Sequence, residues 1–134
     1  MKSPRLLLAL GAALVAVGVA LEAWHAHGLR SSLAPEAWEA VGRAVRTQET
    51  AGLGLFLTGL AVPRGRLLLG VAFLVSALLF CGSVYLKHLA GLEGATAVAP
   101  LGGSLQILAW LGLALLARPR GEGDWSRHPD SNWG

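Results

Sequence analysis

Residues 67–86 read LLLGVAFLVSALLFCGSVYL, twenty consecutive positions without a charged side chain. A helix that crosses the hydrocarbon core of a bilayer needs about 20 apolar residues. Two other stretches have a similar character: residues 6–26 carry a single charge, Glu22, near their end, and residues 101–117 carry none. The sequence therefore predicts an integral membrane protein in which these three stretches are transmembrane helices.

The composition of the whole chain agrees with this prediction. Of its 134 residues, 54% are hydrophobic and 14% are charged, whereas a typical soluble domain has roughly 25% charged residues. The net charge is +3, but the Lys and Arg residues lie in small groups between apolar stretches, a pattern that indicates membrane topology and argues against nucleic-acid binding. The single cysteine, Cys81, excludes an intrachain disulfide and a metal site built on a cysteine pair.

A fourth span is less clear from the sequence. Residues 51–62 are apolar but too short to cross a bilayer alone. They follow residues 35–49, where Pro35 suits the first turn of a helix and where polar and apolar positions alternate at helical spacing. We expect residues 35–49 to form an amphipathic helix at the membrane surface that either bends into, or runs straight on as, the second span. The predicted fold is an all-α, four-span transmembrane bundle over residues 1–117.

The distribution of Lys and Arg predicts the orientation, because cytoplasmic segments carry an excess of these residues. With both termini inside and four spans, seven lie in cytoplasmic segments and four in outer segments. The seven are Lys2, Arg5, Arg64, Arg66, Arg118, Arg120 and Arg127, and the four are Arg30, Arg43, Arg46 and Lys87. We therefore expect a multi-pass protein of the cell membrane with both termini in the cytoplasm.

The two ends of the chain allow further expectations. Residues 6–26 are long for the apolar part of a signal peptide, although residues 18–20 would pass as a cleavage site and cleavage would leave three spans. Residues 118–134 have no apolar run and are expected to be a mobile cytoplasmic tail. Trp125 and Trp133 are unusual in such a tail and would suit anchoring to a partner.

Several short strings point to a known family. They are AHGL at 26–29, FCGSVYL at 80–86, PLGG at 100–103 and AW at 109–110. In this order they resemble the YgdD-like family of small bacterial inner-membrane proteins, and they single out Gly28, Ser83, Tyr85, Gly102 and Gly103 as motif residues. The chain departs from the family pattern where it has Cys81 in place of Ser and Ala109 in place of Gly. It also keeps Gln48 but lacks the neighbouring Tyr and His of the family. The resemblance implies a four-helix membrane protein and no particular activity.

Glu22, His25 and His27 form the most concentrated polar group in an apolar segment. Glu22 and His25 lie one helical turn apart, the spacing that supplies ligands in di-iron bundles, but such sites need further carboxylates from other helices. A metal or haem site and a proton-linked site therefore remain alternatives to the favoured reading, which places these side chains at the water interface beside Trp24. For His27 we favour a helix cap, with Gly28 in the left-handed conformation.

Other polar residues also have two readings. Gln48 shares the apolar face of the helix predicted at 35–49, so we expect it to face protein and to hydrogen-bond to another helix. Glu49 is expected at the membrane surface with its carboxylate in water. A stripe of Ser76, Ser83 and Lys87 would suit a substrate path, but small hydroxyls also simply allow close helix packing. Cys81 is expected to be a small core residue.

Small residues suggest how the helices associate. Ala12, Ala16 and Ala20 repeat every fourth position, which favours close helix contact in lipid. Glycines in residues 101–117 likewise leave room for a neighbouring helix. The glycine pair 102–103 would be at best a weak anion site at a helix start. No motif for soluble catalysis is present. We expect a non-enzymatic protein without a cofactor, whose partners are the lipid bilayer and a second copy or a membrane complex. The alternatives are a small oligomeric transporter or ion-conducting protein using Glu22, His25 and Gln48, and, less favoured, a metal- or haem-binding redox protein.

Overall fold

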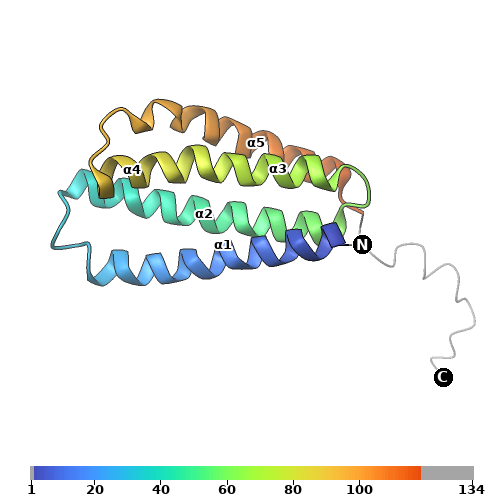
Figure 1. Ribbon diagram of the computed structural model, residues 1–134, viewed down its shortest axis with the longest axis horizontal. Helices are drawn as coiled ribbons and strands as arrows, with labels where there is room; N and C mark the ends of the chain where they lie inside the picture. Colours follow the sequence, from blue (N-terminus) through green and yellow to red (C-terminus); the bar gives the residue numbers. More distant parts are fainter. Residues whose placement is uncertain (1, 119–134) are drawn as a thin grey trace, which may run out of the picture.

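The computed structural model describes residues 2–118, and the expectations for the tail at 119–134 lie outside the described residues. Within that range the chain is helical and contains no strand. The elements are α1 (Lys2–His27), α2 (Pro35–Ala61), α3 (Arg66–Ala77), the π-helical η1 (Leu78–Gly82), α4 (Ser83–Ala90), the short 3₁₀ helix η2 (Ala95–Val98) and α5 (Ala99–Leu116). Since α3, η1 and α4 follow one another without a break, they form one rod (Figure 1). The predicted all-α class is confirmed.

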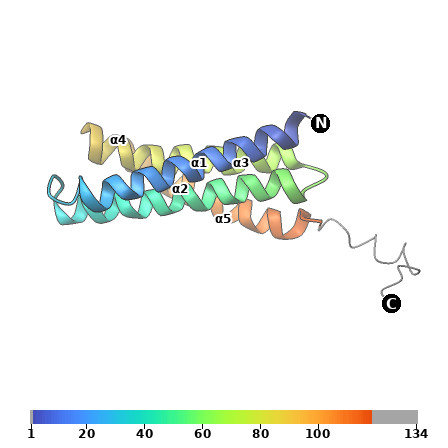
Figure 2. The same cartoon turned by 90° about the horizontal axis from the view of Figure 1, so that it is seen from below.

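The helices lie roughly antiparallel to their neighbours in the chain (Figure 1). Helix α1 packs against α2 and barely touches α3, while α5 packs mainly against α3 and η1 on the other side (Figure 2). Pro35 occupies the start of α2, where its missing N–H is not needed. Gly65, with φ of 78°, makes the tight turn into α3. Helix α2 therefore lies between α1 and the α3–α5 pair.

The four-span prediction is wrong. In the described part of the chain, three helices are long and apolar enough to cross a membrane, namely Pro4–His27, Arg66–Ala90 and Ala95–Leu116. Helix α2 is not among them, because its first half carries charged residues such as Glu39, Arg43 and Arg46. Of the two alternatives for the helix predicted at 35–49, the structure has the straight continuation. This helix runs straight on into residues 51–61 as one helix of 27 residues.

The interior of the bundle is apolar and closely packed. Its largest cluster joins all the long helices through Leu7, Leu55, Phe73, Ala109 and Leu113, and Leu55 and Phe73 have no exposed surface. Phe73 meets the Trp110 ring edge-on, with ring centroids 5.3 Å apart. Since apolar side chains also cover the outside of α1 and α5, exposure to lipid and not to water explains their surface.

Both ends of the described chain lie at the same end of the molecule. The backbone N–H of Arg118 donates to the carbonyl oxygen of Ala61 at 2.7 Å, which ties the end of α5 to the end of α2. Pro4 lines the same recess as Arg66 and Arg118. The opposite end holds the α1–α2 loop and the segment between α4 and α5 (Figure 1).

Candidate functional site

His25 and Trp38 form a clamp between α1 and α2 at the end of the bundle where the two helices are joined. His25 Nε2 lies 2.6 Å from the carbonyl oxygen of Trp38, and since a carbonyl only accepts, Nε2 carries the proton and donates. In return, Trp38 Nε1 donates to the carbonyl oxygen of His25 at 2.9 Å. The two rings stack with centroids 4.3 Å apart. His25 is 8% exposed, so this ring serves the helix contact.

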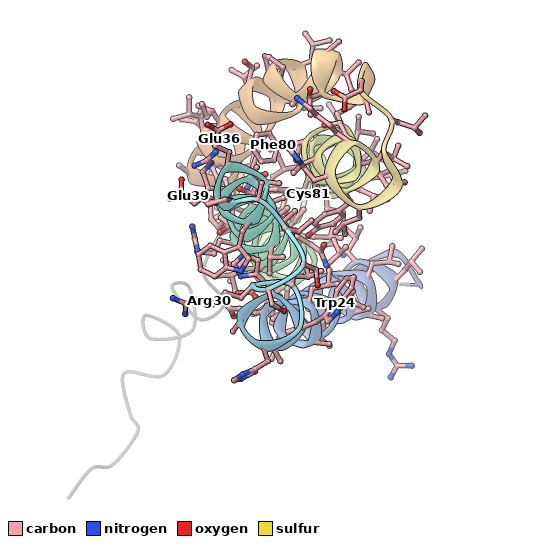
Figure 3. The ribbon with its side chains drawn as sticks, turned by 90° about the vertical axis from the view of Figure 1, so that its left-hand side faces the viewer. Trp24, Arg30, Glu36, Glu39, Phe80 and Cys81 are labelled. Atoms are coloured by element: carbon pink, nitrogen blue, oxygen red, sulfur yellow. The ribbon has the colours of Figure 1, made fainter. Side chains whose placement is uncertain are left out.

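The clamp depends on a glycine in the facing helix. A Cβ atom added at Gly42 would lie 2.8 Å from His25 Cε1 and 2.9 Å from Nε2, so a side chain there would displace the imidazole. The guanidinium of Arg30 lies 5.5 Å from the Trp38 ring centroid and covers the clamp from the loop side. Figure 3 shows Trp24 and Arg30 at this end of the bundle, together with Glu36 and Glu39 from the first turns of α2.

The other members of the predicted polar group do not join His25. Glu22 and His27 are both exposed, while His25 is turned into the α1–α2 contact. Within residues 2–118 there is no group of three or more His, Cys, Asp or Glu side chains placed to hold a metal ion. The three residues therefore do not converge on one ligand in this arrangement.

The expected left-handed cap at Gly28 is wrong. Among the described residues only Gly65 and Gly91 have a positive φ. Gly28 instead continues the end of α1 through its N–H, which donates to the Trp24 carbonyl oxygen at 2.7 Å. The lack of a side chain is needed for space, because an added Cβ would lie 2.7 Å from Cδ1 of the Trp24 indole. His27 therefore has no cap partner of the predicted kind.

Gln48 is the centre of the main polar network inside the bundle. It is 5% exposed. Its Nε2 donates to the carbonyl oxygen of Leu14 in α1 at 3.0 Å, and its Oε1 accepts from the hydroxyl of Tyr85 in α4 at 2.8 Å. The expectation that Gln48 faces protein and bonds to another helix is confirmed. A single side chain thus joins three elements that are distant in the sequence.

The serine side chains in the rod formed by α3, η1 and α4 donate hydrogen bonds to nearby backbone carbonyl oxygens. Ser76 Oγ donates to the Phe73 carbonyl oxygen at 2.7 Å and Ser83 Oγ to that of Phe80 at 2.8 Å. Cys81, labelled in Figure 3, is buried, as expected. Its Sγ donates across to the Ala44 carbonyl oxygen in α2 at 3.1 Å. The π-helical turn around Cys81 is a feature that sequence reasoning did not anticipate. These bonds satisfy the hydroxyls without an open polar path.

Glu49 does not keep its whole carboxylate in water, contrary to expectation. Its side chain packs against Gly18, where an added Cβ would lie 2.5 Å from Glu49 Cγ. One oxygen, Oε1, is buried without a hydrogen-bond partner among the described residues.

The glycine pair at the start of α5 has two different roles. Gly102 is a close-contact position, because an added Cβ would lie 2.5 Å from the backbone nitrogen of Phe80. Gly103 borders a recess of about 470 Å³ between α2 and α5, together with Gln106 and Trp110. Gln106 is 7% exposed and reaches the Thr47 carbonyl oxygen only at 3.5 Å. Gln106 Oε1 and Trp110 Nε1 have no hydrogen-bond partner within the described residues.

Sequence reasoning missed the residues that hold α1 against α2. They are Gly11 and Gly18 in α1 and Gly52 and Gly59 in α2, and each pair is separated by seven residues. An added Cβ at Gly11 would lie 2.5 Å from the Phe56 backbone nitrogen. The predicted row of Ala12, Ala16 and Ala20 is exposed instead. The shared spacing of seven was the available signal, because it keeps glycines on one helix face.

The fold and these contacts define an all-helical integral membrane protein. The chain belongs to the family described as "Protein of unknown function (DUF423)", whose family model matches residues 21–103. A UPF0382 membrane protein of Staphylococcus haemolyticus (strain JCSC1435) is 32% identical over 120 residues, covering 83% of this chain and 93% of that protein. No solved structure matches the chain. These matches show an uncharacterised membrane protein family, and they do not confirm the YgdD-like label.

Proposed function

We propose that the protein is a non-enzymatic component of a larger membrane assembly, held to its partner by the exposed face of α1. The observation that supports this proposal is the exposed row of Ala12, Ala16 and Ala20 on a helix that uses its glycine face for α2. In lipid, helices associate through close packing of small residues. An outward row of this kind is suited to a helix from another chain or from a second copy.

The interior gives no comparable support to the transporter alternative. His25 and Gln48 use their polar atoms in bonds between helices, and Glu22 is exposed at the side. The recess that borders Gln48 and Tyr85 has a volume of about 260 Å³ and is otherwise lined by apolar side chains such as Leu14 and Leu74. A conducting path would need a run of open polar groups along the bundle.

The experiment is purification of the chain from its native membrane in a mild detergent, with a photo-crosslinking residue at Ala16. We expect a crosslinked membrane protein that co-purifies with the wild type. Ala16→Leu should remove it, because the added bulk blocks helix contact. Ala114→Leu, an equal change at an exposed position of α5, is the matched control and should retain it. A wild-type chain that is purified alone, without a crosslink at Ala16, would contradict the proposal.

The orientation is part of the same proposal. We infer that the end of the molecule holding Arg64, Arg66 and Arg118 faces the cytoplasm, since Lys and Arg are enriched there. The test is labelling of intact cells with an impermeant maleimide. A cysteine replacing Ser31 in the α1–α2 loop should react, and one replacing Arg64 should not. The reverse pattern would refute the orientation, and buried Cys81 supplies the background control.

A further inference from the structure

A recess of about 390 Å³ lies at the end of the bundle where α1 and α3 begin and where α2 and α5 end. Pro4 and Leu8 of α1 and Gly59 and Val62 near the end of α2 form part of its wall, and Arg66 and Arg118 complete it. The three apolar helices all start or stop at this end. The recess therefore lies at the level of the lipid headgroups, where the hydrocarbon core meets water.

Arg66 is held in the recess by its side chain and Arg118 by its backbone. Arg66 Nε donates to the carbonyl oxygen of Val62 at 2.9 Å, which uses one of the five N–H donors of the guanidinium. Arg66 is half-buried as a result. The backbone N–H of Arg118 donates to Ala61, so the position of that residue does not depend on its own side chain. Both arginines thus line the recess, and the Arg66 guanidinium keeps four N–H donors for an incoming oxygen.

The local charge is strongly positive. Arg5 and Arg64 are exposed at the same end of the molecule, which adds two cations to the two arginines of the recess. Of the acidic residues in the described chain, Glu22, Glu36, Glu39 and Glu93 belong to the opposite end. Glu49 precedes Ala61 by twelve residues, about 18 Å along α2. Among residues 2–118, no carboxylate lies beside these arginines, so this end of the described chain is cationic and would attract an anion.

Arginines at a helix end can serve only to set the topology, and in that role their side chains are surrounded by water. Arg66 differs from that case because it is anchored and half-buried at the wall of a recess. Leu8, Leu60 and Pro63 supply an apolar wall beside the charge. A phosphate joined to an acyl chain would match both parts, whereas a free anion would match only the first.

We propose that this recess binds an anionic phospholipid, with its phosphate on Arg66 and Arg118 and an acyl chain along the apolar wall of α1 and α2. The site binds a lipid and does not depend on the partner or on the orientation proposed above. Each arginine near an anionic lipid surface is worth about 1 kcal/mol. Two of them predict a preference for anionic over zwitterionic lipid of roughly thirtyfold.

The test is native mass spectrometry of the purified chain with phosphatidylglycerol or phosphatidylcholine of identical acyl chains. The wild type should retain phosphatidylglycerol with the predicted preference. The double variant Arg66→Gln/Arg118→Gln should lose most of it, whereas Arg30→Gln/Arg43→Gln, two exposed arginines toward the opposite end, should keep it. Millimolar inorganic phosphate should leave the lipid bound, because it lacks the acyl contact.

Three results would overturn the proposal. They are equal retention of the two lipids by the wild type, an equal loss in the Arg30/Arg43 variant, and displacement of the lipid by inorganic phosphate. Circular dichroism checks that each variant is folded. If Arg66→Gln is unstable, the variant Arg66→Lys/Arg118→Gln keeps one positive charge but lacks the planar guanidinium that can bind a phosphate through two N–H groups. Its preference for phosphatidylglycerol should lie between those of the wild type and the double glutamine variant.

Discussion

At the scale of single residues, the polar atoms of the interior act as connections between helices. Gln48 joins α1, α2 and α4 through Leu14 and Tyr85, and His25 joins α1 to Trp38 of α2. A buried polar group without a partner costs free energy, so each of these bonds favours one arrangement of the helices. This explains why a helix as polar as α2 is retained in the bundle.

The Gln48–Tyr85 bond should show energetic coupling. Tyr85→Phe removes the donor and leaves Gln48 Oε1 without its partner, so it should lower the free energy of unfolding by about 1 kcal/mol. Gln48→Leu should also destabilise, and the double variant should cost less than the sum by about 0.5–1.5 kcal/mol. Unfolding in mixed detergent micelles gives the free energy of unfolding of the wild type, the two single variants and the double variant. Strictly additive effects would show that the bond is not formed.

Gly11 and Gly82 test whether close helix packing requires glycine, because only Gly11 lies against a neighbouring helix. Gly11→Ala would place Cβ 2.6 Å from the Gly52 carbonyl oxygen, a backbone atom that cannot turn aside, and should destabilise by about 1–3 kcal/mol. Gly82→Ala meets nothing within 4 Å and should be neutral or stabilising by about 0.5–1 kcal/mol. Thermal denaturation in detergent compares them. A stable Gly11→Ala protein would mean that α1 and α2 are further apart than described.

At the scale of helices, apolar length was predictable from the sequence and helix boundaries were only partly so. Residues 6–26 and 67–86 fall within helices apolar enough to cross a membrane, and residues 101–116 of the third predicted stretch fall within another. The continuity of α2 was left open because the pattern changes at Glu49 from amphipathic to apolar. The π-helical turn η1, which contacts α2 and α5, was not predicted, because the apolar pattern of residues 67–86 continues through it unchanged.

The face of α1 that contacts α2 was predicted wrongly, and this gives a test. Alanine and glycine both permit close approach, but the closest contacts leave no room for a Cβ, and here they fall on Gly11 and Gly18. Ala16→Leu should therefore leave the detergent stability of the isolated chain unchanged. The same substitution at Ala44, which is fully buried, should destabilise by about 1–3 kcal/mol. Equal losses in thermal denaturation would place Ala16 inside the bundle.

At the scale of the whole molecule, the candidate sites were predicted less well than the fold class. The sequence identified Gln48 as protein-facing because it shares an apolar helix face, but it grouped Glu22, His25 and His27 by proximity along the chain. Burial separates His25 from the other two. The sequence analysis treated the arginines only as topology signals and did not predict the recess, because Arg66 and Arg118 come together only where the helix ends meet.

The central claim is that α2, although it lacks the hydropathy of a span, is packed along its length inside the bundle. Hydrogen exchange of the chain in phospholipid nanodiscs tests this most directly, because exchange reports the opening of each helix. The account predicts that residues 41–59 exchange as slowly as residues 66–77 of α3 and far more slowly than the loop at 28–34. Exchange of residues 41–59 at the rate of that loop would contradict it.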